Sequence, residues 1–177
     1  MAILNSIVMA FYIALVVYSA WSDARTLRIP NWVSLALVGA FGVAVLMVGL
    51  PLETIAWHFG AGALTLVIGF ALFAFGYFGG GDAKLMAACA LWVGWQHLVF
   101  FVVAVLLVGG VLSVFVVVLR KGLGLWPDWL VQRFEGLFTP NKAVPYGIAI
   151  AVGAMIVLPR MAVLPVSWRP FANWFVG

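Results

Sequence analysis

Charged side chains are almost missing from the central part of the chain. Between Ile29 and Leu119 the only charged residues are Glu53, Asp82 and Lys84. A water-soluble domain carries about 25% charged residues, whereas this chain is 8% charged and 67% hydrophobic. Because so few polar groups cannot cover a globular surface, the sequence predicts an integral membrane protein.

Six apolar runs are candidates for membrane spans, each of which needs a helix of about 20 residues. Only residues 120–142 remain as a sizeable extramembrane segment, so a second globular unit is not expected. The prediction is an all-α, polytopic membrane protein that forms one domain over residues 1–177. The expected spans are Ile3–Trp21, Trp32–Leu50, Ile55–Phe78, Ala83–Trp95, Leu98–Leu119 and Ala143–Leu158.

The basic residues predict how these helices are oriented. Loops rich in Lys and Arg stay in the cytoplasm. We therefore expect both termini outside, and Asp23 and Asp82 on the same cytoplasmic side. Seven of the nine basic residues fall on that side: Arg25, Arg28, Lys84, Arg120, Lys121, Arg133 and Lys142.

The fourth expected span is unusually short. Its residues, Ala83–Trp95, give a helix of about 20 Å against about 30 Å of hydrocarbon. If this helix reaches the outer surface, Asp82 lies roughly 10 Å below the inner one. An acidic side chain at that depth is a candidate functional residue. The preceding glycines, Gly79, Gly80 and Gly81, allow unusual backbone angles and close approach, so we expect a water-filled pocket there.

Two polar segments carry the candidate chemistry. The first is Asp23-Ala24-Arg25-Thr26-Leu27-Arg28-Ile29-Pro30-Asn31, and the second is Gly79-Gly80-Gly81-Asp82-Ala83-Lys84. Each also has a structural interpretation, because Asn31 and Asp82 are both typical N-cap residues. Two carboxyl groups close together in a low-dielectric pocket share a proton. One then serves as general base toward water and the other as general acid, which predicts an aspartyl protease in the membrane.

Together the two segments resemble motifs of the type IV prepilin peptidases, which are intramembrane aspartyl proteases of the GxGD group. The pattern is Asp-x-Arg-x-x-x-Ile-Pro-Asn after the first helix and Gly-x-Gly-Asp-x-Lys before the fourth. A third segment, Val144-Pro145-Tyr146-Gly147, is similar to the proline-containing C-terminal motif of that family. The resemblance extends over the six expected helices.

The resemblance implies roles for particular residues. Asp23 and Asp82 would be catalytic, and Gly79, Gly80 and Gly81 would form the active-site loop. Arg25 and Lys84 could support the pair or the substrate, although Lys84 could equally meet lipid headgroups. The third segment would lie beside the catalytic pair and support it through Pro145, Tyr146 and Gly147.

The resemblance also implies the substrate and the location. The substrate would be a prepilin, cut after a glycine just before its hydrophobic helix, in the inner membrane of a prokaryote. No cofactor or metal is expected, and no basic run interleaved with aromatic residues suggests nucleic-acid binding. The cysteine-rich insertion of the longer, methylating members is missing after the first span. The chain therefore resembles the short form that serves tight-adherence (Flp-type) pili.

Three other segments suggest structural roles. Gly62, Gly69 and Gly76 recur every seven residues, a spacing that lets helices pack closely in lipid. In the segment 120–142, apolar residues recur every three or four positions, which indicates a helix in the membrane interface that acts as a connector or as a substrate lid. The aromatic residues of the C-terminal tail are typical of an interfacial anchor: Trp168, Phe171, Trp174 and Phe175.

Two other functions fit the same acidic residues. A small proton-coupled transporter also places acids inside the membrane as proton relays. A pilus-assembly scaffold without catalytic activity would tolerate the loss of both aspartates. Zinc and serine hydrolases are weaker alternatives, because neither HExxH nor GxSxG occurs in the sequence.

Overall fold

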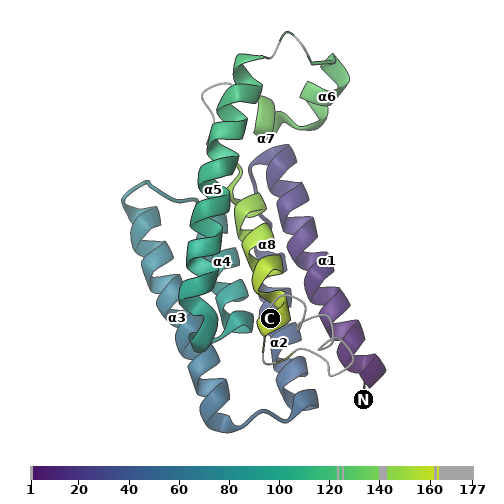
Figure 1. The fold of residues 1–177 in the computed structure, drawn as a ribbon, viewed down its shortest axis with the longest axis vertical. Helices are drawn as coiled ribbons and strands as arrows, with labels where there is room; N and C mark the ends of the chain where they lie inside the picture. Colours follow the sequence, from purple (N-terminus) through teal and green to yellow (C-terminus); the bar gives the residue numbers. More distant parts are fainter. Residues whose placement is uncertain (1, 123, 125, 140–142, 162, 164–177) are drawn as a thin grey trace.

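The computed structural model describes residues 2–122, 124, 126–139, 143–161 and 163. Its described part is built of helices joined by short connections (Figure 1). The helices are α1 (Ala2–Thr26), α2 (Asn31–Val48), α3 (Leu52–Ala74), α4 (Gly80–Val93), η1 (Trp95–His97), α5 (Leu98–Lys121), α6 (Asp128–Arg133), α7 (Glu135–Phe138), α8 (Tyr146–Val157) and η3 (Leu158–Arg160). The expected tail anchor and the basic residue Lys142 lie outside the described residues.

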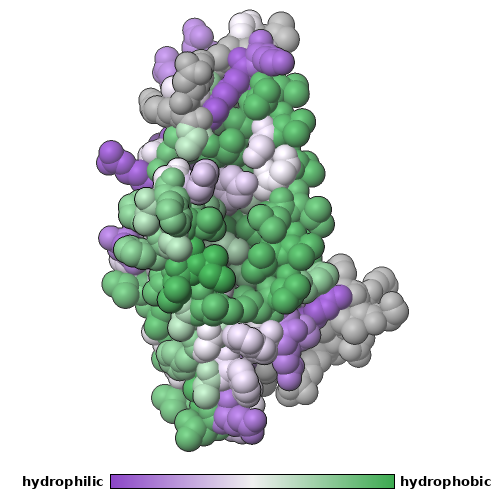
Figure 2. Space-filling model, turned by 90° about the vertical axis from the view of Figure 1, so that its left-hand side faces the viewer, coloured by the Kyte–Doolittle hydropathy of each residue, from purple (hydrophilic) through white to green (hydrophobic). Residues whose placement is uncertain are grey.

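The helices match the six expected spans in order but not all in length. Within the described residues, four helices are long and apolar enough to cross a membrane, namely α1, α2, α3 and η1 with α5. The helices α4 and α8 are shorter. On the face shown in Figure 2, hydrophobic side chains form a broad belt, and hydrophilic residues gather toward both ends. The chain is thus a multi-pass membrane protein.

The short helix α4 lies at the centre of the bundle. It packs against α2, α3, α5 and α8, and its residues from Leu85 to Val93 are almost all buried. Trp92 is fully buried, its ring lies against those of Tyr12 and Phe41, and its indole Nε1 donates a hydrogen bond to the Leu37 carbonyl at 2.9 Å. Because protein surrounds α4, this helix need not span the lipid itself. Its start can therefore lie below the membrane surface.

Close packing between α3 and α4 uses two of the three repeated glycines. A Cβ atom added at Gly69 would lie 3.0 Å from the Cβ atom of Ala83, and one at Gly62 would lie 3.3 Å from that of Leu91. Gly76 differs, because it follows the end of α3 with a φ of 77°, and a Cβ atom added there would meet nothing within 4 Å. The predicted scaffolding role is therefore confirmed for Gly62 and Gly69, whereas Gly76 turns the chain.

Replacement of Gly69 by Leu is expected to destabilise the bundle by about 1–3 kcal/mol, the usual cost of inserting volume into a packed core. Thermal unfolding in detergent micelles measures this loss. Gly60→Leu is the matched control on the same helix, because nothing lies within 4 Å of a Cβ atom there. Equal unfolding temperatures for the two variants would contradict the tight α3–α4 contact.

The segment after α5 forms two short helices instead of the single interfacial helix that the sequence predicted. The break falls at Phe134, whose φ of −126° and ψ of 55° are not helical. The Phe134 ring packs edge-on against Trp21 of α1, with centroids 5.3 Å apart. Arg120 also reaches across the segment, and its Nε donates to the Leu137 carbonyl at 3.0 Å. These tertiary contacts tie the segment to α1 and α5, which the apolar spacing alone could not foresee.

Candidate active site

Asp23 lies in the last turn of α1, where the chain reverses direction. Leu27 follows with a φ of 54°, which is uncommon for a residue with a side chain. The hydroxyl of Ser22 holds this turn by donating to the carbonyl of Arg28 at 2.8 Å. The turn leads into Pro30, which precedes α2 in an extended conformation. Asp23 itself is only 4% exposed.

Asp82 lies in the first turn of α4, and Gly79 is the N-cap of this helix. The N-cap role considered for Asp82 is therefore wrong. Asp82 is the third residue of the helix, and its carboxyl group bonds with the backbone of Gly79, as the N3 acid does in a capping box. Asn31, likewise considered as an N-cap, is the first residue of α2 after Pro30.

The three glycines before Asp82 act through close approach and not through unusual backbone angles. Gly80 and Gly81 are helical, and Gly79 has an ordinary extended conformation with a φ of −75°. A Cβ atom at Gly81 would lie 3.3 Å from the Cβ atom of Ile29, so the start of α4 sits directly against the chain that follows α1. The expectation of unusual backbone angles at these glycines was therefore wrong.

The first turn of α8 meets Asp23 directly. The backbone N–H of Gly147 donates to Asp23 Oδ2 at 2.7 Å, and Pro145 is the N-cap of α8. A Cβ atom at Gly147 would lie 2.9 Å from both the Cβ and Oδ2 atoms of Asp23, and 3.0 Å from Ile29 Cδ1. Gly147 comes 124 positions after Asp23 in the sequence and holds its carboxyl group. Only glycine leaves enough space for this carboxyl group.

The two aspartates line one cavity of about 520 Å³. Asp82 lies outside the four long spans. Its pKa is raised to about 7, mainly by burial and further by the nearby charge of Asp23. The hydrogen bond with the Gly79 backbone lowers this pKa and so opposes the shift. The cavity is lined by Ser22, Asp23, Thr26, Leu27, Arg28, Ile29, Pro30, Asn31, Gly79, Gly80, Gly81 and Asp82. Two carboxyl groups that influence each other in this way can share a proton.

The remaining predicted support residues lie at the edge of this cavity or beyond it. Arg25 places its guanidinium over the Trp21 ring, 5.5 Å from the centroid. Lys84 donates from Nζ to Asn31 Oδ1 at 2.9 Å. The Tyr146 ring packs edge-on against Phe78, with centroids 5.8 Å apart.

The sequence interpretation missed several residues of the cavity. Arg28 was used only to predict topology, although it lines the cavity together with Ser22 and Thr26. Arg28 lies within the first motif, directly before Ile29. This position in the motif was the sequence signal that could have marked Arg28 as a residue of the cavity. No sequence pattern marked Ser22, whose contribution depends on the turn that follows α1.

These features define the class of protein. The chain is a helical, multi-pass membrane protein in which acidic side chains from two helices face one polar cavity. A family model described as the type IV leader peptidase family matches residues 10–114, which is more than half of the chain. The chain therefore belongs to the type IV leader peptidase family, whose substrates are prepilins.

The matched stretch contains Asp23 and Asp82 but ends before Gly147. The contact between Gly147 and Asp23 is therefore an observation from the structure alone. A search of curated proteins and a search of solved structures returned no match.

Proposed function

We propose that this leader peptidase is an aspartyl endopeptidase that removes the leader of Flp-type prepilins at the cytoplasmic face of the membrane. The observation that carries the proposal is the shared cavity of Asp23 and Asp82, in which Gly147 orients one carboxyl group. Two carboxyl groups that share one proton are the arrangement with which soluble aspartic proteases activate water.

The proposed reaction needs one water and one shared proton. The ionised carboxylate accepts a proton from water as the water oxygen attacks the scissile carbonyl carbon. The protonated carboxyl group donates to the carbonyl oxygen, so a neutral tetrahedral intermediate forms. Proton transfer to the leaving nitrogen then breaks the C–N bond and releases an amine and a carboxylic acid. The pair titrates as a unit, so neither role is assigned to one aspartate.

The distribution of charge supports a cytoplasmic cavity. The ends of α1, α3 and α5 and the starts of α2 and α4 lie toward one end of the bundle (Figure 1). The basic residues of that end include Arg25, Arg28, Lys84, Arg120 and Lys121, and such an excess is typical of the cytoplasmic side. The prepilin leader would then approach from the cytoplasm.

The short connection between α1 and α2 supports the short, Flp-type form. Only residues 27–30 separate these helices, at the place where longer members of the family carry their cysteine-rich insertion. No methyltransferase activity is proposed for the chain.

Cleavage of a purified precursor tests the proposal. The chain is reconstituted in vesicles with a Flp-type prepilin, and the products are analysed by mass spectrometry. We expect a shortened pilin whose new N-terminus follows the leader glycine. An intact precursor, together with acid-driven proton flux into the vesicles, would instead favour the transporter interpretation.

A further inference from the structure

A cavity of about 270 Å³ lies at the end of the bundle opposite the acidic cavity. The start of α3, the end of α4 and the short helices η1 and η3 form its walls, and α3 and α4 carry these segments to that end in Figure 1. Charged, polar and aromatic side chains gather in it, among them Trp57, His58, Trp95, His97 and Arg160. Such a lining is typical of a site for a small polar ligand.

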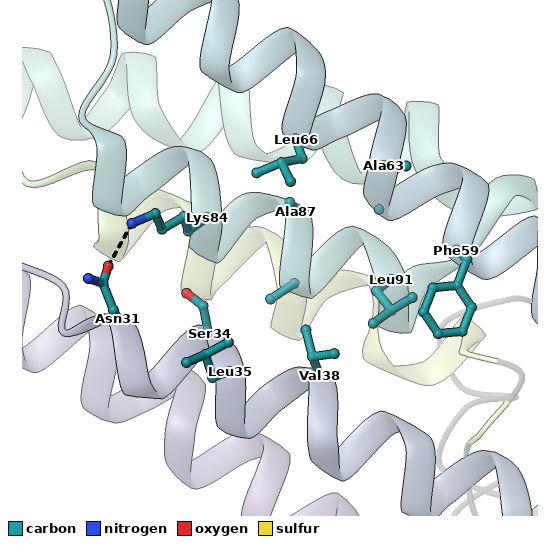
Figure 3. Close-up of a pocket in the computed structure, with 12 residues that line it drawn as sticks. Asn31, Ser34, Leu35, Val38, Phe59, Ala63, Leu66, Lys84, Ala87 and Leu91 are labelled. Carbon is teal, nitrogen blue, oxygen red and sulfur yellow. Dashed lines mark hydrogen bonds between the residues drawn. The ribbon is translucent and has the colours of Figure 1, made fainter.

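The groove between α2 and α3 offers no comparable set of groups. It has a volume of about 530 Å³, and most of the residues that line it are apolar. Figure 3 shows its polar pair, in which Lys84 donates to Asn31 at 2.9 Å. The Ser34 hydroxyl is too deeply buried to reach an occupant. The cavity at the other end, in contrast, contains an accessible acceptor without a partner.

This acceptor is a ring nitrogen of His58, a residue that is only 4% exposed. His58 Nδ1 lies 2.7 Å from the Leu91 carbonyl oxygen. Because a carbonyl only accepts, Nδ1 carries the proton, and Nε2 of the neutral ring keeps a lone pair that can accept. No described residue bonds to Nε2, and Nε2 is not one of the unpartnered atoms that the core seals off. A ligand in the cavity can therefore donate to it.

Gly94 keeps the polar edge of His58 open. It has a φ of 75°, a conformation that glycine adopts readily. A Cβ atom there would lie 2.9 Å from Nε2 and 2.7 Å from Cε1 of His58. The His58 ring also packs against Phe41, with centroids 5.3 Å apart. The ring is thus held in place beside the cavity that Gly94 and His58 both line.

Arg160 and two tryptophans supply the other recognition groups. The guanidinium of Arg160 lies over the Phe100 ring, 4.6 Å from the centroid, and a guanidinium suits the geometry of a phosphate. The rings of Trp57 and Trp95 have centroids 5.5 Å apart, and both side chains are about half exposed. Tryptophan faces attract ammonium groups. Tryptophan is also typical of the membrane–water interface.

We propose that this cavity binds the headgroup of a phospholipid in which an ammonium group follows the phosphate, as in phosphatidylethanolamine. The phosphate pairs with Arg160, and the ammonium group donates to His58 Nε2 beside the two tryptophan rings. The cavity is smaller than the sites of drug-sized ligands, which measure about 300–1,000 Å³, so it admits a headgroup and leaves the acyl chains in the membrane. This site goes beyond the proposed function and does not depend on it.

Lipid binding to the purified, full-length chain tests the proposal. Native mass spectrometry in detergent measures the Kd for phosphatidylethanolamine, phosphatidylcholine and phosphatidylglycerol with identical acyl chains. Phosphatidylcholine keeps the positive charge but has no N–H to donate to His58 Nε2, and phosphatidylglycerol has hydroxyl groups in place of the amine. We expect phosphatidylethanolamine to bind about tenfold more tightly than either, as the loss of a charge-assisted hydrogen bond implies. An equal Kd for phosphatidylethanolamine and phosphatidylcholine would overturn the proposal.

Two variants locate the binding site. Arg160→Gln removes the guanidinium, and we expect the Kd for phosphatidylethanolamine to rise about tenfold. Trp95→Leu removes one aromatic face at an exposed position, and we expect a several-fold rise at an unchanged unfolding temperature. Lys121→Gln is the control, because it makes the same change of charge at an exposed residue at the end of α5. Wild-type Kd values in both Arg160→Gln and Trp95→Leu would refute this location.

The soluble headgroup O-phosphoethanolamine distinguishes a lipid from a free solute. We expect it to displace bound phosphatidylethanolamine only at a large molar excess, because it lacks the acyl chains that bury apolar area against the protein. Displacement at an equal concentration would identify a water-soluble ligand and would overturn the assignment of a lipid.

Discussion

Replacement of either Asp23 or Asp82 by Asn is expected to lower the rate of leader cleavage by at least about 10³-fold. General acid–base catalysis contributes about 10²–10⁴-fold in rate, and each substitution leaves the pair without the second group that the mechanism needs. An Asn side chain has nearly the size of Asp, so the cavity keeps its shape. Single-turnover cleavage of a purified precursor measures the effect.

The matched control is Asp128→Asn, which changes an exposed acid of α6 and should leave the rate unaltered. Full activity in Asp23→Asn or Asp82→Asn would defeat the aspartyl mechanism. Loss of activity in all three variants would show only that the assay responds to charge in general.

The raised pKa of Asp82 allows loss of catalysis to be separated from misfolding. The pKa is about 7 in the folded chain and about 3.9 for an Asp in an unfolded chain. Between these values the folded chain binds the proton more tightly, so the free energy of unfolding falls as pH rises from about 4 to 7. Asn has no carboxyl group to ionise, so the Asp82→Asn variant does not lose stability in this way as the pH rises. We therefore expect the unfolding temperature of Asp82→Asn to rise relative to wild type over this range, whereas a constant difference would contradict the raised pKa.

Gly147→Ala is expected to lower kcat about 10²-fold, which is the second largest effect. The new methyl group would lie 2.9 Å from Asp23 Cβ and Oδ2, so the carboxyl group must move. A displacement of about 1 Å in a catalytic group can cost about 10²-fold in rate. The backbone N–H of residue 147 remains present, so this variant tests the position of Asp23 and not the presence of its donor.

Gly153→Ala is the control for packing in the same helix. A Cβ atom at Gly153 would lie 2.5 Å from Val105 Cγ2, so this variant should lower the unfolding temperature, while kcat stays near the wild-type value. If Gly147→Ala and Gly153→Ala lose activity in proportion to their loss of stability, Gly147 is a packing residue and does not position Asp23.

The sequence was most informative where a property depends on local composition. Hydropathy located all six long apolar segments, and it marked α4 as short from its limited apolar run. The burial of α4 and α8 inside the bundle was less accessible, because hydropathy does not distinguish contact with protein from contact with lipid. The same limit applies to residues 120–142, where the predicted helix is interrupted at Phe134, whose ring contacts Trp21 of α1.

Sequence alone therefore determined a membrane-embedded helical chain with two acidic residues in an otherwise apolar region, because the cost of burying charge in lipid is a property of each residue. The arrangement of those residues was decided only by tertiary structure. The bond from Gly147 to Asp23 and the cavity that Asp23 shares with Asp82 both depend on how separate helices pack. Neither the distance nor the direction between such groups is encoded in a local pattern of residues.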